Sequence, residues 1–192
     1  MDDVMAELAT DRGTPPKPSL AAMIRNIFPV LMLIVLCLGF GLLSDRFLSV
    51  NNALIVMQQS AVLLVAAVAM TFVIVSGSID LSVGSIVAVS ALAAASLSSS
   101  FGAFAIGPAM LVGLACGAIN GALFAYGKIP SFIVTRGTLV IFRGIVLLFT
   151  KGAPVSISDT EFLGFYAGRT LGMPNTVLIA LVVTGLAALV FN

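Results

Sequence analysis

Long apolar segments recur along this chain, and they limit its fold more than any other feature. Six of them approach or exceed the length of about 20 residues that crosses a bilayer as a helix. Of the 192 residues, 60% are hydrophobic and only 9% are charged, whereas soluble domains have about 25% charged residues. The apolar runs are continuous and do not alternate with polar residues, which argues for helices and against a barrel. We therefore expect an all-α, polytopic transmembrane helix bundle.

The predicted organisation is a tail followed by one transmembrane domain. Residues 1–23 contain several charged residues and three prolines, a composition that cannot bury a core and predicts a flexible cytoplasmic tail. The domain covers residues 24–192, with spans expected near 24–44, 53–75, 83–97, 105–126, 132–150 and 174–192. Lysine and arginine are slightly more frequent on the side of the N-terminus, which places both ends in the cytoplasm. Because the last span has no polar flank, we expect the natural protein to continue beyond it.

A polar segment at residues 77–85 separates the second and third predicted spans. Its carboxylate, Asp80, is the only acidic residue between Asp45 and Asp159. A charge in hydrocarbon costs between about 2.5 and over 10 kcal/mol, so Asp80 needs a partner or a function there. The surrounding glycines and serines can bend the backbone and form hydrogen bonds, which predicts a helix break near Asp80. Two interpretations stay open: Asp80 caps or anchors the break, or it acts in a transport pathway or its coupling.

Small and polar residues mark the fourth predicted span. Gly113, Gly117 and Gly121 are spaced by four residues, so they share one helical face, and such a pattern is a common device for close helix packing. Asn120 lies beside that face. We interpret it first as a hydrogen bond between helices and second as a pathway residue.

Two arginines lie seven residues apart in the fifth predicted span and share roughly one helical face. Arg136 is near the start of the span and is expected to reach the nearby membrane surface. Arg143 is deeper and is expected to face protein or a polar cavity, where an ion pair with Asp80 is one arrangement. The candidates for a pathway or coupling role, all polar in apolar surroundings, are Asp80, Asn120, Thr135 and Arg143.

Several functions are excluded by what the sequence lacks. Histidine is absent, which removes histidine acid–base catalysis, histidine metal ligands and Ser-His-Asp nucleophiles. The phosphate-binding pattern G-x-x-x-x-G-K-[ST] does not occur either. We therefore expect no enzyme activity, no metal and no cofactor, and the net charge of +1 gives no indication of nucleic-acid binding.

Four motifs together resemble one family of transport proteins. They are TFVIVSGSIDLSVGS at residues 71–85, NG at 120–121, PSFIVT at 130–135 and FRG at 142–144. Their order and spacing are similar to those of the permease subunits of bacterial ribose- and xylose-type ABC importers. Ser78 replaces the usual glycine and Arg136 the usual leucine, and the roughly ten spans of that family imply that this chain is the first part of a permease. Around Asp80, the motif residues are Gly77, Ser78, Ile79, Leu81, Ser82 and Gly84.

The resemblance implies a multi-pass protein of the bacterial cytoplasmic (inner) membrane that translocates a ribose- or xylose-type monosaccharide. Its partners would be a cytoplasmic ATPase subunit, a periplasmic sugar-binding protein, a second permease subunit in a homodimer, and the lipid bilayer. The permease itself would perform no covalent chemistry. The alternative is a proton-coupled secondary transporter or channel in which Asp80 carries the proton. An intramembrane enzyme and a shortened chain that serves only in assembly, or not at all, are weaker alternatives.

Overall fold

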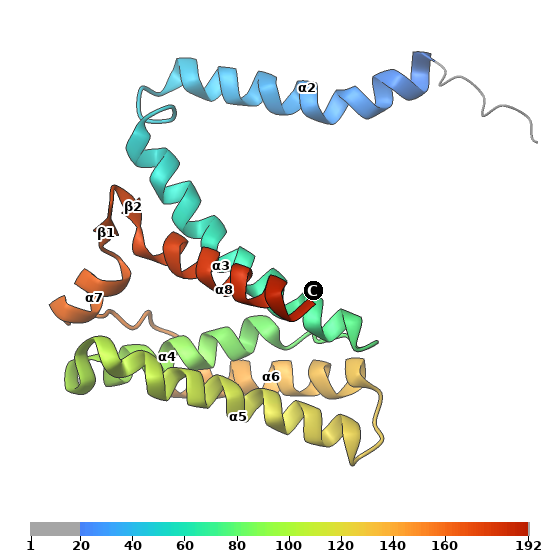
Figure 1. Cartoon of the computed structure of the whole chain (residues 1–192), viewed down its shortest axis with the longest axis vertical. Helices are drawn as coiled ribbons and strands as arrows, with labels where there is room; N and C mark the ends of the chain where they lie inside the picture. Colours follow the sequence, from blue (N-terminus) through green and yellow to red (C-terminus); the bar gives the residue numbers. More distant parts are fainter. Residues whose placement is uncertain (1–19, 192) are drawn as a thin grey trace, which may run out of the picture. The chain divides into compact units, whose positions relative to one another are not determined.

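The computed structural model describes residues 20–191, and most of this part is helical (Figure 1). The predicted all-α fold is confirmed. In chain order the elements are α2 (Leu20–Leu43), α3 (Val50–Val75), α4 (Val83–Phe101), the 3-10 helix η1 (Gly102–Ala105), α5 (Ile106–Ala125), α6 (Ser131–Thr150), α7 (Thr160–Tyr166), β1 (Arg169–Thr170), β2 (Met173–Pro174) and α8 (Asn175–Phe191).

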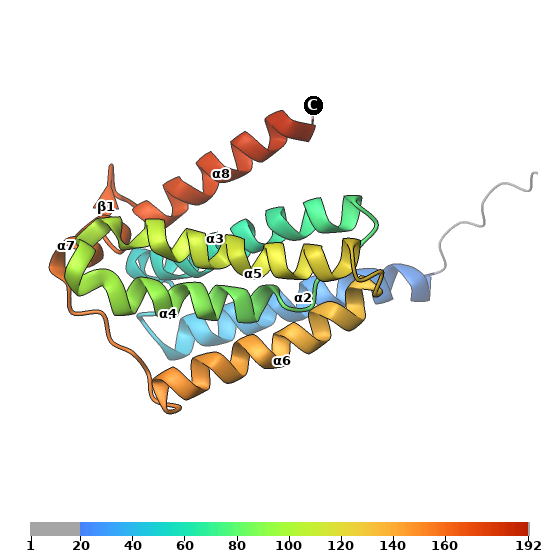
Figure 2. The ribbon, with the colours of Figure 1, turned by 90° about the horizontal axis from the view of Figure 1, so that it is seen from below.

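Each predicted span overlaps one long helix. Helix α2 begins at Leu20, inside the predicted tail, and the rest of that tail, residues 1–19, lies outside the described residues. By length and composition, three helical stretches among the described residues can cross a membrane: Val50–Val75, Val83–Ala125 and Ser131–Thr150. The second is too long for one crossing, and it folds back on itself at η1 (Figure 2). The apolar helices Ile27–Leu43 and Asn175–Val190 are shorter, and their crossing stays a prediction.

The chain divides into two units between Ala53 and Leu54. In the described part of the first unit, the hydroxyl oxygen of Ser49 accepts a hydrogen bond from the backbone N–H of Asn52 at 3.2 Å. Serine at this position satisfies one of the free N–H groups at the start of α3. The Asn52 side chain donates to the carbonyl oxygen of Phe47, at 2.8 Å.

The second unit is built on α4, which packs against both α5 and α6, while α5 also contacts α6. Small residues permit this close packing. A Cβ atom added at Gly113 of α5 would lie 2.9 Å from the hydroxyl oxygen of Ser90 on α4, so a larger residue would force the Ser90 side chain to shift. The three helices position the polar segment that precedes α4.

The connection from residue 151 to residue 174 is more ordered than a simple polar loop. The Asp159 carboxylate caps α7 by accepting a hydrogen bond from the N–H of Phe162 at 2.7 Å. The Phe162 ring then packs in a buried cluster with Ala94, Ala105 and Ala109. Beyond α7, β1 and β2 form a short antiparallel pair in which Thr170 faces Met173.

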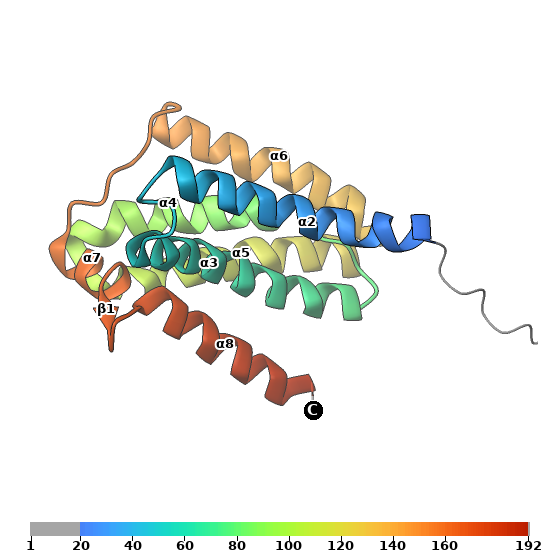
Figure 3. The ribbon, with the colours of Figure 1, turned by 90° about the horizontal axis from the view of Figure 1, so that it is seen from above.

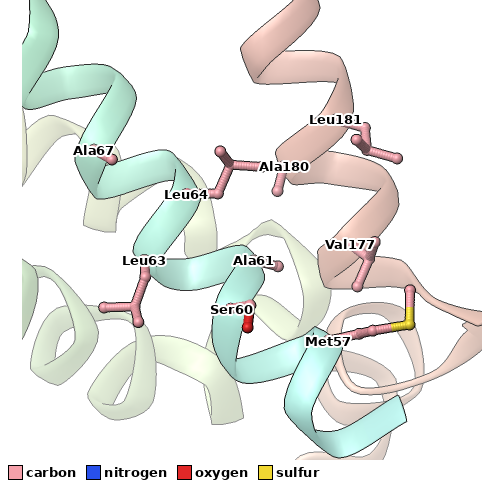
Figure 4. Close-up of a pocket in the computed structure, with 9 residues that line it drawn as sticks. All are labelled: Met57, Ser60, Ala61, Leu63, Leu64, Ala67, Val177, Ala180 and Leu181. Atoms are coloured by element: carbon pink, nitrogen blue, oxygen red, sulfur yellow. The ribbon is translucent and has the colours of Figure 1, made fainter. Parts of the chain in front are cut away.

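Helices α3 and α8 meet around Ala61, Val177 and Ala180, which are buried (Figure 4). Toward its C-terminal end α8 diverges from α3 (Figure 3). The two helices border a groove of about 490 Å³ whose lining is apolar except for Ser60. This groove therefore has almost no groups that could form hydrogen bonds with a ligand.

Candidate functional site

Helix α3 ends in a turn in which one residue must adopt a positive φ. Gly77 has φ of +73°, the left-handed region in which glycine pays no steric penalty. Its N–H donates to the carbonyl oxygen of Ile74 at 2.9 Å, and the N–H of Ser78 donates to that of Val73 at 3.1 Å. This pair of bonds is the Schellman pattern of a helix C-terminus. The helix break predicted near Asp80 therefore begins at Gly77.

Asp80 organises the turn into the next helix. Its Oδ1 accepts hydrogen bonds from the backbone N–H of Ser82 at 2.7 Å and from the hydroxyl of Ser82 at 2.6 Å. The Ser82 carbonyl oxygen in turn accepts from the N–H groups of Ser85 and Ile86, both at 2.9 Å. One carboxylate thus holds the residue from which α4 starts.

Asn120 of α5 extends this network across the helices. Its Nδ2 donates to the Ser82 hydroxyl oxygen at 2.7 Å. A serine hydroxyl has a single hydrogen, and here that hydrogen is directed to Asp80. Ser82 must therefore accept from Asn120, which assigns the orientation of the amide. Asn120 is only 6% exposed, and its Oδ1 has no hydrogen-bond partner among the described residues.

Helix α6 holds the other side of the same loop. The Thr135 hydroxyl accepts from the N–H of Leu81 at 3.1 Å and donates to the carbonyl oxygen of Ile79 at 3.3 Å. One turn earlier, the Ser131 hydroxyl oxygen accepts from the N–H of Ile79 at 3.2 Å. Non-helical backbone at membrane depth must find such partners in protein or water. Residues 79–82 are therefore tied to α5 and α6 at once.

A cavity of about 230 Å³ lies beside this loop, and its lining is mixed. Carboxylate, amide and hydroxyl groups come from the loop and from α5 and α6, and apolar side chains complete the wall. The lining residues are Val73, Ser76, Ser78, Ile79, Asp80, Gly117, Asn120, Gly121, Phe124, Ser131, Val134 and Thr135. Such a combination of apolar surface and a few polar groups is typical of small-molecule sites.

Three of the four predicted pathway candidates come together here: Asp80, Asn120 and Thr135. The fourth, Arg143, lies eight residues after Thr135, which is about 12 Å along a helix. Its side chain is exposed, and no ion pair between it and Asp80 occurs in the described part of the chain. Arg136 is also exposed and does not line the cavity.

The glycines predicted to pack helices have different surroundings. Gly113 faces α4 closely, as described above, whereas Gly117 and Gly121 line the cavity and have no atom within 4 Å of an added Cβ. For those two the packing role stays a prediction. Gly84, in the first turn of α4, likewise has open space around it.

Ser131 and Phe124 are site residues that sequence reasoning did not single out. Ser131 follows Pro130 in one of the quoted motifs, and a hydroxyl at a helix start is a recognisable signal for a backbone contact. Phe124 carried no such signal, because a phenylalanine in an apolar span is ordinary. Among the described residues no group of three histidine, cysteine, aspartate or glutamate side chains could hold a metal ion.

Residues 52–192 match a family described as "Branched-chain amino acid transport system / permease component". The chain belongs to this permease family. It is 36% identical over 156 residues to the ribose import permease protein RbsC of Escherichia coli K12, a match that covers 78% of this chain and 49% of that protein. No solved structure matches it significantly.

Two further relatives have names that specify other solutes. The D-allose transport system permease protein AlsC of Escherichia coli K12 is 38% identical over 160 residues, which cover 81% of this chain and 48% of AlsC. The autoinducer 2 import system permease protein LsrC of Shigella flexneri is 33% identical over 151 residues, covering 78% and 44%. The chain thus spans about half the length of the curated relatives it matches. The resemblance to sugar importer permeases is confirmed at the level of the family.

Proposed function

We propose that this chain is part of the permease of an ATP-driven ABC importer that carries a monosaccharide across the bacterial cytoplasmic membrane. The observation that supports this most is the match of about four fifths of the chain to permeases named for ribose and for allose. Within this class, we propose that the transported monosaccharide is a ribose- or xylose-type sugar. The broken helix pair α3–α4 supplies hydrogen-bonding groups inside an apolar domain, which a path for a polar solute requires.

The proposal assigns energy coupling to other chains. Because the sequence has no phosphate-binding pattern, ATP hydrolysis belongs to a cytoplasmic ATPase subunit. A periplasmic sugar-binding protein delivers the solute, and a second permease subunit completes the path as a homodimer. In this arrangement the chain performs no covalent chemistry.

The proton-coupled alternative gains no specific support from the geometry. Asp80 Oδ1 accepts two hydrogen bonds from Ser82, which is the arrangement of a capping carboxylate. A capping role explains the presence of the carboxylate without a proton cycle.

Uptake in membrane vesicles tests the proposal. The chain is expressed with the ATPase and binding protein encoded beside it, and in parallel the full reading frame of its gene is expressed with the same partners. We expect the subunits to co-purify and labelled ribose, xylose or allose to accumulate with ATP and binding protein, independently of a proton gradient. Uptake that follows the proton gradient without ATP would instead support the secondary transporter.

Asp80→Asn provides the matched variant for this assay. It keeps an oxygen that can accept from Ser82 but removes the charge. We expect normal insertion into the membrane and reduced uptake by the complete importer. Normal uptake at normal expression would contradict a role of Asp80 in transport.

A further inference from the structure

We propose that the cavity beside residues 76–82 contacts the transported solute and suits a neutral, hydroxyl-rich molecule, not an amino acid. This inference rests on the proposed function, and it concerns the selectivity of one cavity. It addresses a difference between the family description, which refers to branched-chain amino acids, and the relatives named for sugars.

The charge of the lining is the first argument. Among the described residues that line the cavity, Asp80 is the one ionisable side chain. An amino acid brings a carboxylate, which a dry site binds only beside a cation or a set of directed N–H donors. Arg143 lies too far along α6, and Arg136 is outside the lining. The ammonium group of an amino acid can pair with Asp80, but its carboxylate then meets a lining that offers no cation, whereas a neutral solute needs no such partner.

Unused hydrogen-bonding capacity is the second argument. The two bonds that Asp80 accepts both use Oδ1, so Oδ2 can accept from a hydroxyl of the solute. Ser131 accepts from Ile79, and its own hydrogen is free to be donated. Ser78 makes no described side-chain hydrogen bond and lines the same cavity. A polyhydroxylated solute matches this set, because each of its hydroxyls both donates and accepts.

Size and shape agree with a monosaccharide. Small-molecule pockets usually have volumes of about 300 to 1,000 Å³, so a cavity of about 230 Å³ admits only a small solute. Phe124 and Val134 provide an apolar wall for the C–H face of a sugar ring. The polar groups come from the loop, from Asn120 of α5 and from the first turn and a half of α6.

The buried pair Ser82 and Asn120 has a positioning role, although Asn120 also lines the cavity. Ser82 holds Asp80 Oδ1 and Asn120 holds Ser82, so that Oδ2 stays fixed as the acceptor for the solute. Neither residue needs to contact the solute to affect its binding. In this interpretation Asp80 and Ser131 are contact residues, and Ser82 and Asn120 are positioning residues.

Protection of a cysteine probe tests the site directly. In a background with Cys37→Ala and Cys116→Ala, the variant Ser78→Cys places a thiol in the cavity without removing a described hydrogen bond. Ser99→Cys, at an exposed position near the end of α4, is the matched control. Membranes that contain the full permease are treated with N-ethylmaleimide in the presence of ribose, allose or leucine.

We expect ribose or allose to slow alkylation at position 78 several-fold, leucine to leave it unchanged, and none of the three to affect position 99. Adding Asp80→Asn should raise the sugar concentration that gives half-maximal protection about tenfold, because a hydrogen bond to a charged acceptor is lost. An alkylation rate at position 78 without sugar that equals the parent's shows that this variant keeps the folded cavity. Protection by leucine, or no protection by either sugar, would overturn the proposal.

The outcomes separate this inference from the proposed function. ATP-dependent sugar uptake without protection at position 78 would keep the importer and reject this site. Protection by sugar without ATP-dependent uptake would keep the site and reject the importer. An Asp80→Asn permease protected as well as the parent would reject Asp80 as the acceptor.

Discussion

Ser82 is the residue whose loss should disturb the helix break most, and its effect can be worked out from the contacts. Ser82 is completely buried, and its hydroxyl connects Asn120 Nδ2 to Asp80 Oδ1 at 2.7 and 2.6 Å. In Ser82→Ala, the Asn120 amide loses the only partner that its side chain has in the described residues. Asp80 keeps the backbone N–H of residue 82 as a donor.

The expected cost follows from these two losses. A buried polar group left without a partner costs about 1 to 3 kcal/mol, and a hydrogen bond to a charged group contributes about 1.5 to 3 kcal/mol. Asp80 keeps the N–H bond from residue 82 and is partly exposed, so losing the hydroxyl bond to Asp80 should cost an amount at the low end of its range. We expect Ser82→Ala to lower the free energy of unfolding by about 3 kcal/mol, which for a chain of this size corresponds to a Tm lower by about 6 to 12 °C.

A fluorogenic maleimide in detergent micelles can measure this change. Cys116 is buried in α5, so it reacts when the helices separate, and Cys37→Ala removes the second thiol. Ser99→Ala, at an exposed position, is the control and should change stability by less than about 0.5 kcal/mol.

A double variant isolates the contact. Ser82→Ala with Asn120→Leu removes both partners, so we expect it to be less destabilised than the sum of the single variants by about 1 to 2 kcal/mol. A Tm for Ser82→Ala within about 2 °C of the parent would refute the argument. So would strict additivity in the double variant.

Three further predictions concern the same unit. Thr135→Val keeps the shape of the side chain but removes both loop hydrogen bonds, so it should cost about 1 to 3 kcal/mol in the same thermal assay. Gly77→Ala should destabilise by about 1 to 2 kcal/mol because of its positive φ, whereas Gly84→Ala, with equally open space but no positive φ, should be neutral or stabilising; equal effects would contradict the φ argument. Tyr166 donates to the carbonyl oxygen of Ala103 at 3.0 Å, and burial raises the pKa of its phenol. The parent should therefore lose stability relative to Tyr166→Phe as the pH rises above the unfolded pKa of about 10, and a stability difference that is constant from pH 8 to 11 would contradict this.

The helices were predictable to within a few residues because each depends on a continuous apolar run. The break after α3 was also predictable, since Gly77 and Asp80 interrupt such a run with residues that favour turns. Helix α7 and the β1–β2 pair were not predicted, because the segment 151–174 is short of periodic apolar residues. Phe162 shows the reason: its burial depends on Ala105 and Ala109, which lie more than 50 positions earlier in the chain.

The sequence indicated several residues of the candidate site but not how they contact one another. Asp80, Asn120 and Thr135 stood out because polar side chains in apolar spans need partners. Arg143 is also a polar side chain in an apolar span, but it lies on a different part of α6 and is exposed. It needs no partner in the chain, because an exposed arginine can reach water or lipid headgroups. Ser131 was missed because a serine at a helix start has an ordinary local explanation.

The sequence by itself determined the class of this protein, since an apolar composition of this degree leaves helices in a bilayer as the stable arrangement. It also determined where the chain must turn, because glycine and aspartate act locally. Only the tertiary structure decided which polar groups meet. Asn120 donates to Ser82 only because α5 packs beside α4, and Leu81 donates to Thr135 only because α6 does so too. These hydrogen bonds join residues 38 or more positions apart, so helix packing and not local sequence forms them.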